Sequence, residues 1–308
     1  MIYPECAHSH LLFKEGRVTQ VVPQGIMVLS LEEAYLQFGT FFQSRLIDHE
    51  RPKNGAFVYV LPKYQNKTPF QIMLEDETAH LFIALGKEST LAVSVVQKGD
   101  AVFDLSCESN SRFTMDLIGE GRMMFKGGLK GGATLKAIGA SKGNSHQTYR
   151  ITLDGEGAAA DLRGAVFLDE KSKHTTNVLI HHRKPYTRSN QQFKGVLKGH
   201  SQSQFEGKIY VDPIAQKTEA YQLNNNLLLS DHAIATTKPN LEIFADDVKA
   251  SHGATIGYVD ERGLFYLQTR GIPKAHATHL LIRGFIQEIL DEMTLPSARA
   301  LATSLAGS

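Results

Sequence analysis

The sequence predicts a mainly β protein with a helical C-terminal region. From about residue 56 to residue 257, apolar and polar residues alternate in short segments separated by Gly, Asn, Ser and Lys, which is typical of strands with one buried face. After residue 257 the apolar residues recur at helical spacing instead. Hydrophobic residues make up 42% of the 308 residues, so the chain can build a sizeable core.

The first stretch, residues 1–55, contains one short predicted helix. Ser30 is placed as its N-cap and Glu33 as its third residue, which is the pattern of a capping box. Apolar residues follow at helical spacing over 31–38, and Gly39 can end the helix.

The middle stretch, residues 56–257, is the predicted β core. The clearest alternating apolar positions are Ala101, Phe103, Leu105, Cys107, Phe113, Met115, Leu117, Tyr149, Ile151 and Leu153. Similar short segments recur at 165–169, 174–181, 193–197 and 205–211. Closely spaced strands of this kind fit a sandwich, a barrel or a β-solenoid. Between the alternating segments of residues 56–257, Asn-Gly does not occur and Asp-Gly occurs once, at 154–155, so hairpin turns are scarce and a parallel β-helix is favoured.

The last stretch, residues 258–308, is predicted to be helical. Asp260 can cap a first helix and Gly271 can end it, while Pro273 and Pro296 can open two further helices. We expect these helices to pack on the end of the β region and to cover its open edge. The expected apolar positions of the second and third helices are Leu281, Phe285, Ile289, Ala298, Leu301 and Leu305.

Composition and charge argue against several functional classes. The chain has 33 basic and 32 acidic residues and a net charge of +1, whereas a nucleic-acid-binding protein normally has a clear basic excess. No uncharged apolar run approaches the roughly 18–20 residues that cross a bilayer, and the N-terminus does not resemble a signal peptide. Cys6 and Cys107 are the only cysteines, which excludes a disulfide framework and a CxxC motif. We therefore expect a soluble, cytoplasmic protein that binds neither nucleic acid nor membrane.

Two local motifs suggest enzymes, but a structural role fits each of them better. Gly139-Ala-Ser-Lys-Gly143 matches the GxSxG nucleophile elbow, yet the residues after it predict a strand and not the required helix. Asp246 and Asp247 are adjacent, so on a strand they would point to opposite faces and could not act as a paired acid and base. A β-helical carbohydrate-active enzyme, either a lyase or a hydrolase, remains an alternative without a recognisable carboxylate pair.

One contiguous part of the chain resembles the SufB/SufD family of iron–sulfur cluster assembly proteins. It covers residues 220–257 and reads AYQLNNNLLLSDHAIATTKPNLEIFADDVKASHGATIG. The resemblance continues through GLFYLQTRGI at 263–272 and extends upstream through 187–199 and 205–222, and its SHGAT segment is closer to SufD than to SufB. It implies a right-handed parallel β-helix flanked by helical segments, which agrees with the pattern described above.

The resemblance also implies a non-enzymatic scaffold subunit. Such a subunit pairs with a SufB-like chain through the β-helix and binds the SufC ABC-type ATPase through its C-terminal helices. It binds no cofactor tightly alone, and an iron–sulfur cluster would be held transiently at the interface with SufB. An alternative is a homodimer of this chain that fulfils the roles of both the SufB-like and the SufD-like subunit. The implied ATPase contacts are Leu264, Phe265, Tyr266, Arg270 and Gly271.

His252 is the implied metal ligand of this chain. It lies in a segment where the family frequently has CSHGAT, and Ala250 here replaces the cysteine. A neutral imidazole can supply one nitrogen ligand to iron. The alternative is that the ring only hydrogen-bonds a backbone carbonyl and fixes a turn into Gly253. The resemblance further implies that the chain begins inside the family's usual N-terminal domain, so that residues 1–55 are a remnant of it.

Overall fold

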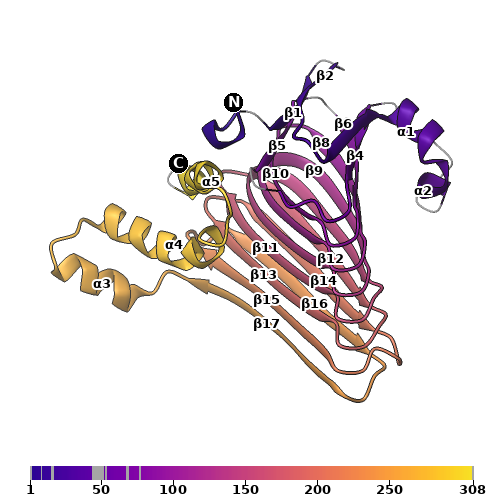
Figure 1. Ribbon diagram of the computed structural model, residues 1–308. Coiled ribbons are helices and arrows are strands. Elements are labelled where there is room, and N and C mark those ends of the chain that lie inside the picture. Colours follow the sequence, from indigo (N-terminus) through magenta and orange to yellow (C-terminus); the bar gives the residue numbers. More distant parts are fainter. Residues whose placement is uncertain are drawn as a thin grey trace.

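The computed structural model describes residues 2–7, 9–14, 17–43, 52, 54–66, 69–75 and 78–306. Within these residues, seventeen strands form one continuous sheet that winds into a parallel β-helix, with short helices near the N-terminus and longer ones at the C-terminus (Figure 1). The predicted fold class is therefore confirmed. No helix in the described ranges is both long and apolar enough to cross a membrane.

The N-terminal segment opens the sheet. A 3-10 turn at Pro4–Cys6 precedes β1 (His10–Lys14), β2 (Arg17–Val21), β3 (Ile26–Ser30), α1 (Leu31–Gln37) and α2 (Gly39–Gln43). The predicted capping box is present at α1: the backbone N–H of Ser30 donates to the Glu33 carboxylate at 3.0 Å, and the backbone N–H of Glu33 donates to the Ser30 hydroxyl at 3.3 Å. Because β1 and β3 pair with strands of the body, the segment contributes to the same sheet.

The body of the β-helix follows a simple pairing rule. Its strands are β4 (Gly55–Val60), β5 (Phe70–Leu74), β6 (Thr78–Leu85), β7 (Thr90–Gln97), β8 (Asp100–Cys107), β9 (Arg112–Leu129), β10 (Thr134–Leu153), β11 (Ala159–Leu168), β12 (Lys173–His182), β13 (Arg188–Leu197), β14 (Gln202–Val211), β15 (Thr218–Leu228), β16 (Ile234–Ile243) and β17 (Val248–Tyr258). Strands pair in parallel with the strand two places later, as β11 does with β13 and β12 with β14. The long strands β9 and β10 bend, so that each of them contributes to two faces of the β-helix. Each position therefore lies over its counterpart in the previous coil.

One turn of each coil repeats the same backbone geometry. A residue with positive φ donates its backbone N–H to a carbonyl of the next coil, as Asn110 does to Gly131 at 2.9 Å and Lys217 to Asp247 at 2.6 Å. Such a turn leads the chain into a parallel strand, whereas the Asn-Gly turns of hairpins reverse it. This explains the scarcity of hairpin dipeptides. The residues with positive φ at this turn are Lys63, Glu88, Asn110, Gly132, Gly157, Tyr186 and Lys217.

The apolar residues predicted to face inward form the core. Phe103, Leu105, Met115, Leu117, Ile151 and Leu153 are each at most 3% exposed, and all belong to one cluster. Stacking of coils places aromatic rings over one another, with 6.1 Å between the ring centroids of Phe103 and Phe125 and 6.3 Å between those of Phe125 and Tyr149. The inward register assigned from alternation is confirmed.

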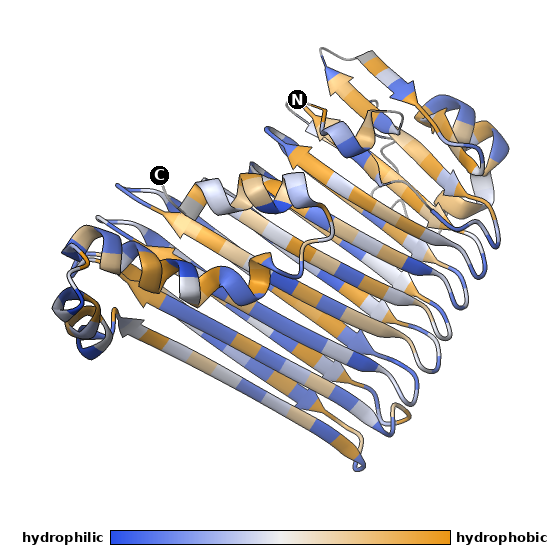
Figure 2. Ribbon diagram, turned by 60° about the vertical axis from the view of Figure 1, so that its left-hand side comes forward, coloured by the Kyte–Doolittle hydropathy of each residue, from blue (hydrophilic) through white to orange (hydrophobic). Residues whose placement is uncertain are grey.

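The interior of the later coils is partly polar, at inward positions of β12, β13 and β15, and these strands carry many hydrophilic residues (Figure 2). The ring of His182 hydrogen-bonds the hydroxyls of Thr187 and Ser189, each at 2.8 Å, and the Asn226 amide donates to the Asn224 side-chain oxygen at 2.8 Å. Hydrogen bonds of this kind offset the cost of burying polar groups. The buried polar residues at these inward positions include His174, His182, Gln191, Gln222, Asn224 and Asn226.

Helices α3 (Glu261–Thr269), α4 (Lys274–Leu290) and α5 (Pro296–Ala306) follow β17. Asp260 caps α3 as predicted, because its carboxylate accepts the backbone N–H groups of Arg262 and Gly263, each at 3.1 Å. Gly271 follows the end of α3 with φ +82°, a conformation that favours glycine. Helices α4 and α5 lie across the outer face of the sheet (Figure 2).

The expected buried positions of these helices are only partly correct, and the expected place where they pack is wrong. In α4, Ile289 is buried as expected, but Leu281 and Phe285 are only half-buried, and the other buried residues are Ala277, Ile282, Ile286 and Leu290. In α5, Ala298 is buried as expected together with Ala302, whereas Leu301 is 38% exposed. The helices also cover a flank of the β-helix and not its open end, because outward-facing apolar side chains of β9, β10, β11 and β13 gather there. These sheet residues are Ile118, Ile138, Ala140, Ala165, Phe167 and Val196.

Core truncation tests this register. Ile151→Ala should lower the free energy of unfolding by about 2–5 kcal/mol, because it removes buried methyl groups and leaves a cavity. Arg150→Ala, one residue earlier on the exposed face of the same strand, should change it by less than about 0.5 kcal/mol. Urea denaturation of both variants measures the difference, and similar losses for the two would contradict the assigned register.

The buried histidines predict acid sensitivity. Burial is the main cause that lowers the pKa of His174 to about 3 and that of His182 to about 4. In the unfolded chain the histidine pKa is about 6.5, so between pH 6.5 and pH 4 the unfolded state binds more protons and stability falls as the pH falls. Each histidine should remove about 2 kcal/mol of stability between pH 6.5 and pH 5.

A difference measurement isolates this effect from other titrating groups. His174→Gln should lose about 2 kcal/mol less than the wild type when the pH is lowered from 6.5 to 5. Urea denaturation at the two pH values measures both losses. An identical pH dependence for the two chains would show that His174 becomes protonated without unfolding.

Candidate functional site

The last coil leaves one end of the β-helix uncovered. In the described part of the chain, β17 pairs with β15 alone and β16 pairs with β14, and no later coil follows. The outer backbone edge of β17 is therefore unpaired, and nearly all of its residues are exposed. An exposed strand edge of this length is a template for pairing with another chain. Large apolar side chains exposed around this end are Ile234, Phe244, Ile256 and Tyr258.

His252 lies in the middle of β17 and is exposed. It is in register with Gln222 of β15, and paired residues of parallel strands lie on the same face, so His252 shares the interior face of the buried Gln222. The expected turn into Gly253 is absent, because Gly253 continues the strand. The structure does not test whether His252 binds metal, and this role stays a prediction.

Within the described ranges, the side chains of this chain do not complete a metal site around His252. Across the described residues, no group of three or more His, Cys, Asp or Glu side chains is arranged to hold a metal ion. Both cysteines are buried far from β17 in the sequence, and burial raises the pKa of Cys6 to about 11 and that of Cys107 to about 12. Protonated, buried thiols are poor ligands.

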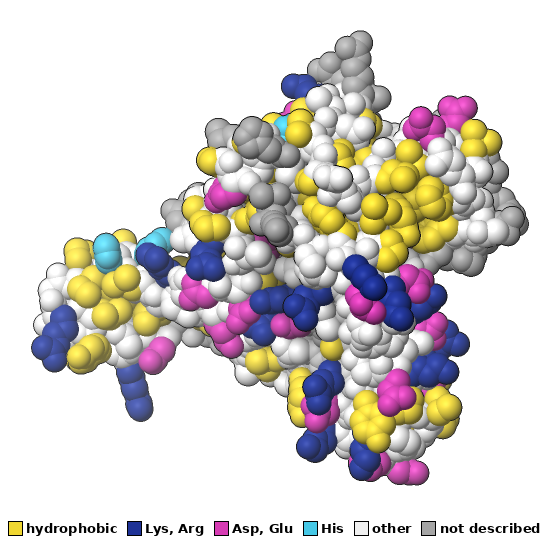
Figure 3. Space-filling model, viewed as in Figure 1, with side chains coloured by type: hydrophobic (Ala, Val, Ile, Leu, Met, Phe, Trp, Pro, Cys, Tyr) yellow, Lys and Arg dark blue, Asp and Glu magenta, His cyan; other side chains and the backbone are white. Residues whose placement is uncertain are grey.

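The α3–α4 hairpin projects from the body and carries apolar side chains on its surface (Figure 3). Helix α3 buries none of its residues. Phe265 is 69% exposed and Tyr266 is 56% exposed, whereas Leu264 is half-buried. The Arg270 guanidinium lies over the Tyr266 ring at 5.3 Å from its centroid. The predicted ATPase contacts thus share one short projecting segment, and two of them expose large aromatic surfaces.

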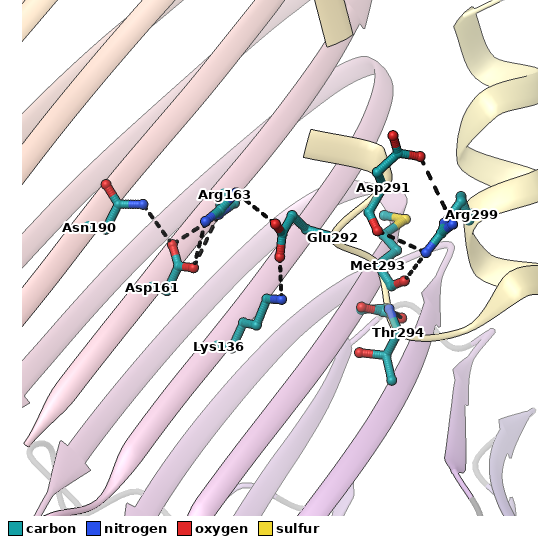
Figure 4. Close-up of polar contacts among 10 residues, drawn as sticks. Lys136, Asp161, Arg163, Asn190, Asp291, Glu292, Met293, Thr294 and Arg299 are labelled. Carbon is teal, nitrogen blue, oxygen red and sulfur yellow. Dashed lines mark hydrogen bonds and ion pairs between the residues drawn. The ribbon is translucent and has the colours of Figure 1, made fainter. Parts of the chain in front are cut away.

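Polar contacts hold the other C-terminal helices against the sheet (Figure 4). Glu292, between α4 and α5, accepts from Lys136 at 2.6 Å and lies 3.5 Å from Arg163. The Lys194 ammonium donates to Glu288 at 2.8 Å. One carboxylate oxygen of the buried Asp116 accepts the backbone N–H groups of residues 294 and 295 at 2.8 and 2.9 Å.

The Asp116 contact is unusual because the side chain is completely buried. Burial raises the pKa of Asp116 to about 6, although the two backbone donors and the charges of Lys136 and Arg299 act in the opposite direction. Together with the apolar contacts of α4 and α5, this contact fixes the two helices to the β-helix, while α3 extends beyond them.

A comparison with protein families identifies the chain. The family described as "SUF system FeS cluster assembly, SufBD core domain" matches residues 127–285, just over half of the chain. The chain belongs to the SufBD family. The matched part includes β10 to β17, α3 and most of α4, and so contains both the open end and the projecting hairpin.

Several proteins are similar in sequence to this SufBD chain. A SufBD family protein of Synechocystis sp. is 46% identical over 124 residues, which cover 40% of this chain and 27% of that protein. SufD of Escherichia coli is 34% identical over 165 residues, covering 54% of this chain and 37% of that protein. SufD of Bacillus subtilis is 30% identical over 279 residues, covering 82% and 63%. The chain is SufD-like, and it spans less than two thirds of the length of these relatives.

The sequence of this SufBD chain pointed to His252 and the α3 segment, but not to the buried polar residues Gln191, Gln222 and Asp116. Gln191 and Gln222 occupy inward positions of their strands. A polar residue at a position where alternation predicts an apolar one was the signal that could have identified them. Asp116 alternates with the inward Met115 and Leu117 as an ordinary outward residue would. Nothing in its local sequence indicates that α5 lies above it.

Proposed function

We propose that the chain is a non-enzymatic scaffold subunit of the SUF iron–sulfur cluster assembly system, acting in the cytoplasm with a SufB-like chain and a SufC-like ATPase. The observation that carries this proposal is the uncovered end of the β-helix, which lies within the SufBD core match. A subunit that works alone has no use for an unpaired strand edge bordered by exposed apolar side chains.

The open end supports pairing with a SufB-like chain. A partner strand beside β17 would satisfy its free backbone donors and acceptors, as β-strand addition does in other complexes. It would also cover Ile256 and Tyr258, which are 46% and 62% exposed. A second copy of this chain could bind the same edge, so the self-sufficient homodimer remains the alternative within this class.

The projecting hairpin supports ATPase binding. Aromatic residues and arginine are the residue types that most often dominate the energy of protein interfaces. Phe265, Tyr266 and Arg270 are all exposed on α3 or directly after it. Leu264 is half-buried, and Gly271 allows the chain to turn into α4, so these two shape the segment more than they contact a partner.

His252 supports a role in holding the cluster while it is built. Its imidazole would supply one nitrogen to iron, and the partner would supply the thiolates that this chain lacks at the open end. The cluster is a transient cargo in this proposal and not a resident cofactor.

The carbohydrate-enzyme alternative gains no support from the carboxylates considered for it. Asp246 and Asp247 lie in the bend between β16 and β17, and Asp247 pairs with Lys217. Likewise, the GxSxG segment at 139–143 lies inside β10, where no helix follows it. Neither motif has the arrangement that a hydrolase or lyase requires.

Point variants in α3 test the ATPase contact. Phe265→Ala combined with Tyr266→Ala should weaken SufC binding at least about tenfold, because large aromatic side chains at interface centres contribute 2 kcal/mol or more. Titration calorimetry with the ATPase measures the dissociation constant. Leu301→Ala, which truncates an exposed apolar residue of α5, is the control and should leave binding unchanged. Equal affinities for both variants would refute the proposed contact.

These variants are preferable to deletion of residues 258–308. Deletion would also remove α4 and α5 and expose the apolar sheet face that they cover. The resulting loss of stability or solubility would obscure any effect on binding.

His252→Ala tests the ligand role. The variant should assemble normally with its partners, since His252 is exposed and truncation disturbs no core contact, but the purified complex should retain much less iron and sulfide. His232→Ala, an exposed histidine in the turn between β15 and β16, is the matched control. Wild-type iron and sulfide contents in the His252 variant would exclude it as a ligand.

A further inference from the structure

A column of interior side chains ends at His252. Strand register places Leu162, Gln191, Gln222 and His252 at the same position of successive coils. Leu162 and Gln191 are fully buried, Gln222 is 3% exposed, and His252 on the terminal strand is exposed. The column therefore changes from aliphatic to amide to imidazole as it approaches the open end.

The two glutamines of this column form a hydrogen-bonded pair with a fixed direction. The Gln222 amide nitrogen donates to the Gln191 side-chain oxygen at 2.8 Å. The other end atom of this amide, the Gln222 side-chain oxygen, does not bind Gln191, and His252 is the next residue of the column. This oxygen, Oε1, is buried and has no hydrogen-bond partner. Buried amide oxygens are nearly always hydrogen-bonded, so an orphan at this position points to a donor that binds there.

A glycine on the neighbouring face makes room for the Gln222 amide. A Cβ added to Gly207 of β14 would lie 2.2 Å from the Gln222 amide nitrogen and 2.8 Å from the Phe205 ring. Any larger residue would therefore displace the amide. Gly207 therefore leaves the space that the Gln222 amide occupies.

We propose that Gln222 is a positioning residue for His252. Its Oε1 accepts one ring N–H of His252, which fixes the tautomer and leaves the second ring nitrogen free to bind iron. Neighbouring strands lie about 4.8 Å apart, so rotation of the exposed His252 side chain about its own torsions is enough to make this bond. Metal-binding histidines commonly donate their other N–H to a carbonyl or carboxylate oxygen in this way.

Gln191 supports Gln222 from the interior. Its side-chain oxygen accepts the Gln222 amide N–H, and while this bond is made the Gln222 oxygen remains available to accept from His252. The inference rests on the proposed ligand role of His252, but the hydrogen bond itself requires neither cluster nor partner.

The tautomer of His252 tests the positioning directly. In the full-length chain with ¹⁵N-labelled histidine, at a pH well above the ordinary histidine pKa, NMR reports which ring nitrogen carries the proton. We expect the ratio of the two His252 tautomers to be about fivefold larger than in an unrestrained imidazole, because one net hydrogen bond stabilises the favoured tautomer. Gln222→Met, which keeps the length of the side chain but removes the acceptor, should abolish this excess.

Matched variants keep the test decisive. Asn226→Leu, which replaces a buried amide of the same strand opposite Ile256, should leave the His252 tautomer unchanged. Circular dichroism confirms that each variant is folded, and Gln222→Leu provides the same comparison should Gln222→Met not fold. A tautomer ratio that is the same in wild type and in a folded Gln222 variant would overturn the proposal.

The cluster content of the assembled complex separates this inference from the function on which it rests. If Gln222→Met changes the tautomer and lowers retained iron and sulfide, the positioning role and the ligand role are both supported. If the tautomer changes while iron and sulfide do not, Gln222 positions His252 and the ligand role fails. A loss of cluster without a change of tautomer would refute the positioning role alone.

Discussion

In-register parallel pairing between successive coils is the interaction on which the rest of this structure depends. It satisfies the backbone of each coil from the coils on either side and places each side chain over its counterpart, as Phe125 lies between Phe103 and Tyr149. The interior columns, the repeated turns with positive φ and the outer face that binds α4 and α5 all follow from it. The same pairing must stop at the last coil, so the unpaired edge of β17 is a direct consequence of the fold.

The sequence predicted the fold where this stacking uses apolar residues. Alternation identified the inward positions of β8, β9 and β10 because those positions are apolar, and it weakened in later strands where inward positions hold histidine, glutamine and asparagine. No repeat was visible because the coils differ in length: Thr134 pairs with Ala159, whereas Arg188 pairs with Glu219. The covered face of α4 was misassigned because leucine and isoleucine occupy adjacent positions there, and only contact with the sheet distinguishes Leu281 from Ile282.

The candidate site was less predictable than the fold. His252 was recognised through resemblance to a family, since an isolated histidine has no physical signature in a sequence. The contacts that fix the C-terminal helices could not be predicted, because Asp116 and the backbone of residue 294 are 178 positions apart. The amide pair of Gln191 and Gln222 depends on strand register between coils, which alternation within a strand does not specify.

The interior near the open end combines polar and apolar positions. Gln222 and Asn226 place amides inside the last coils, whereas the terminal strand has apolar residues at inward positions, such as Ile256, which is 46% exposed. The hydrogen bonds of the amides are directional and some remain unmade, as at the Gln222 oxygen. An end that exposes both apolar side chains and an unpaired strand edge is the kind of surface that the proposed partner strand beside β17 would cover.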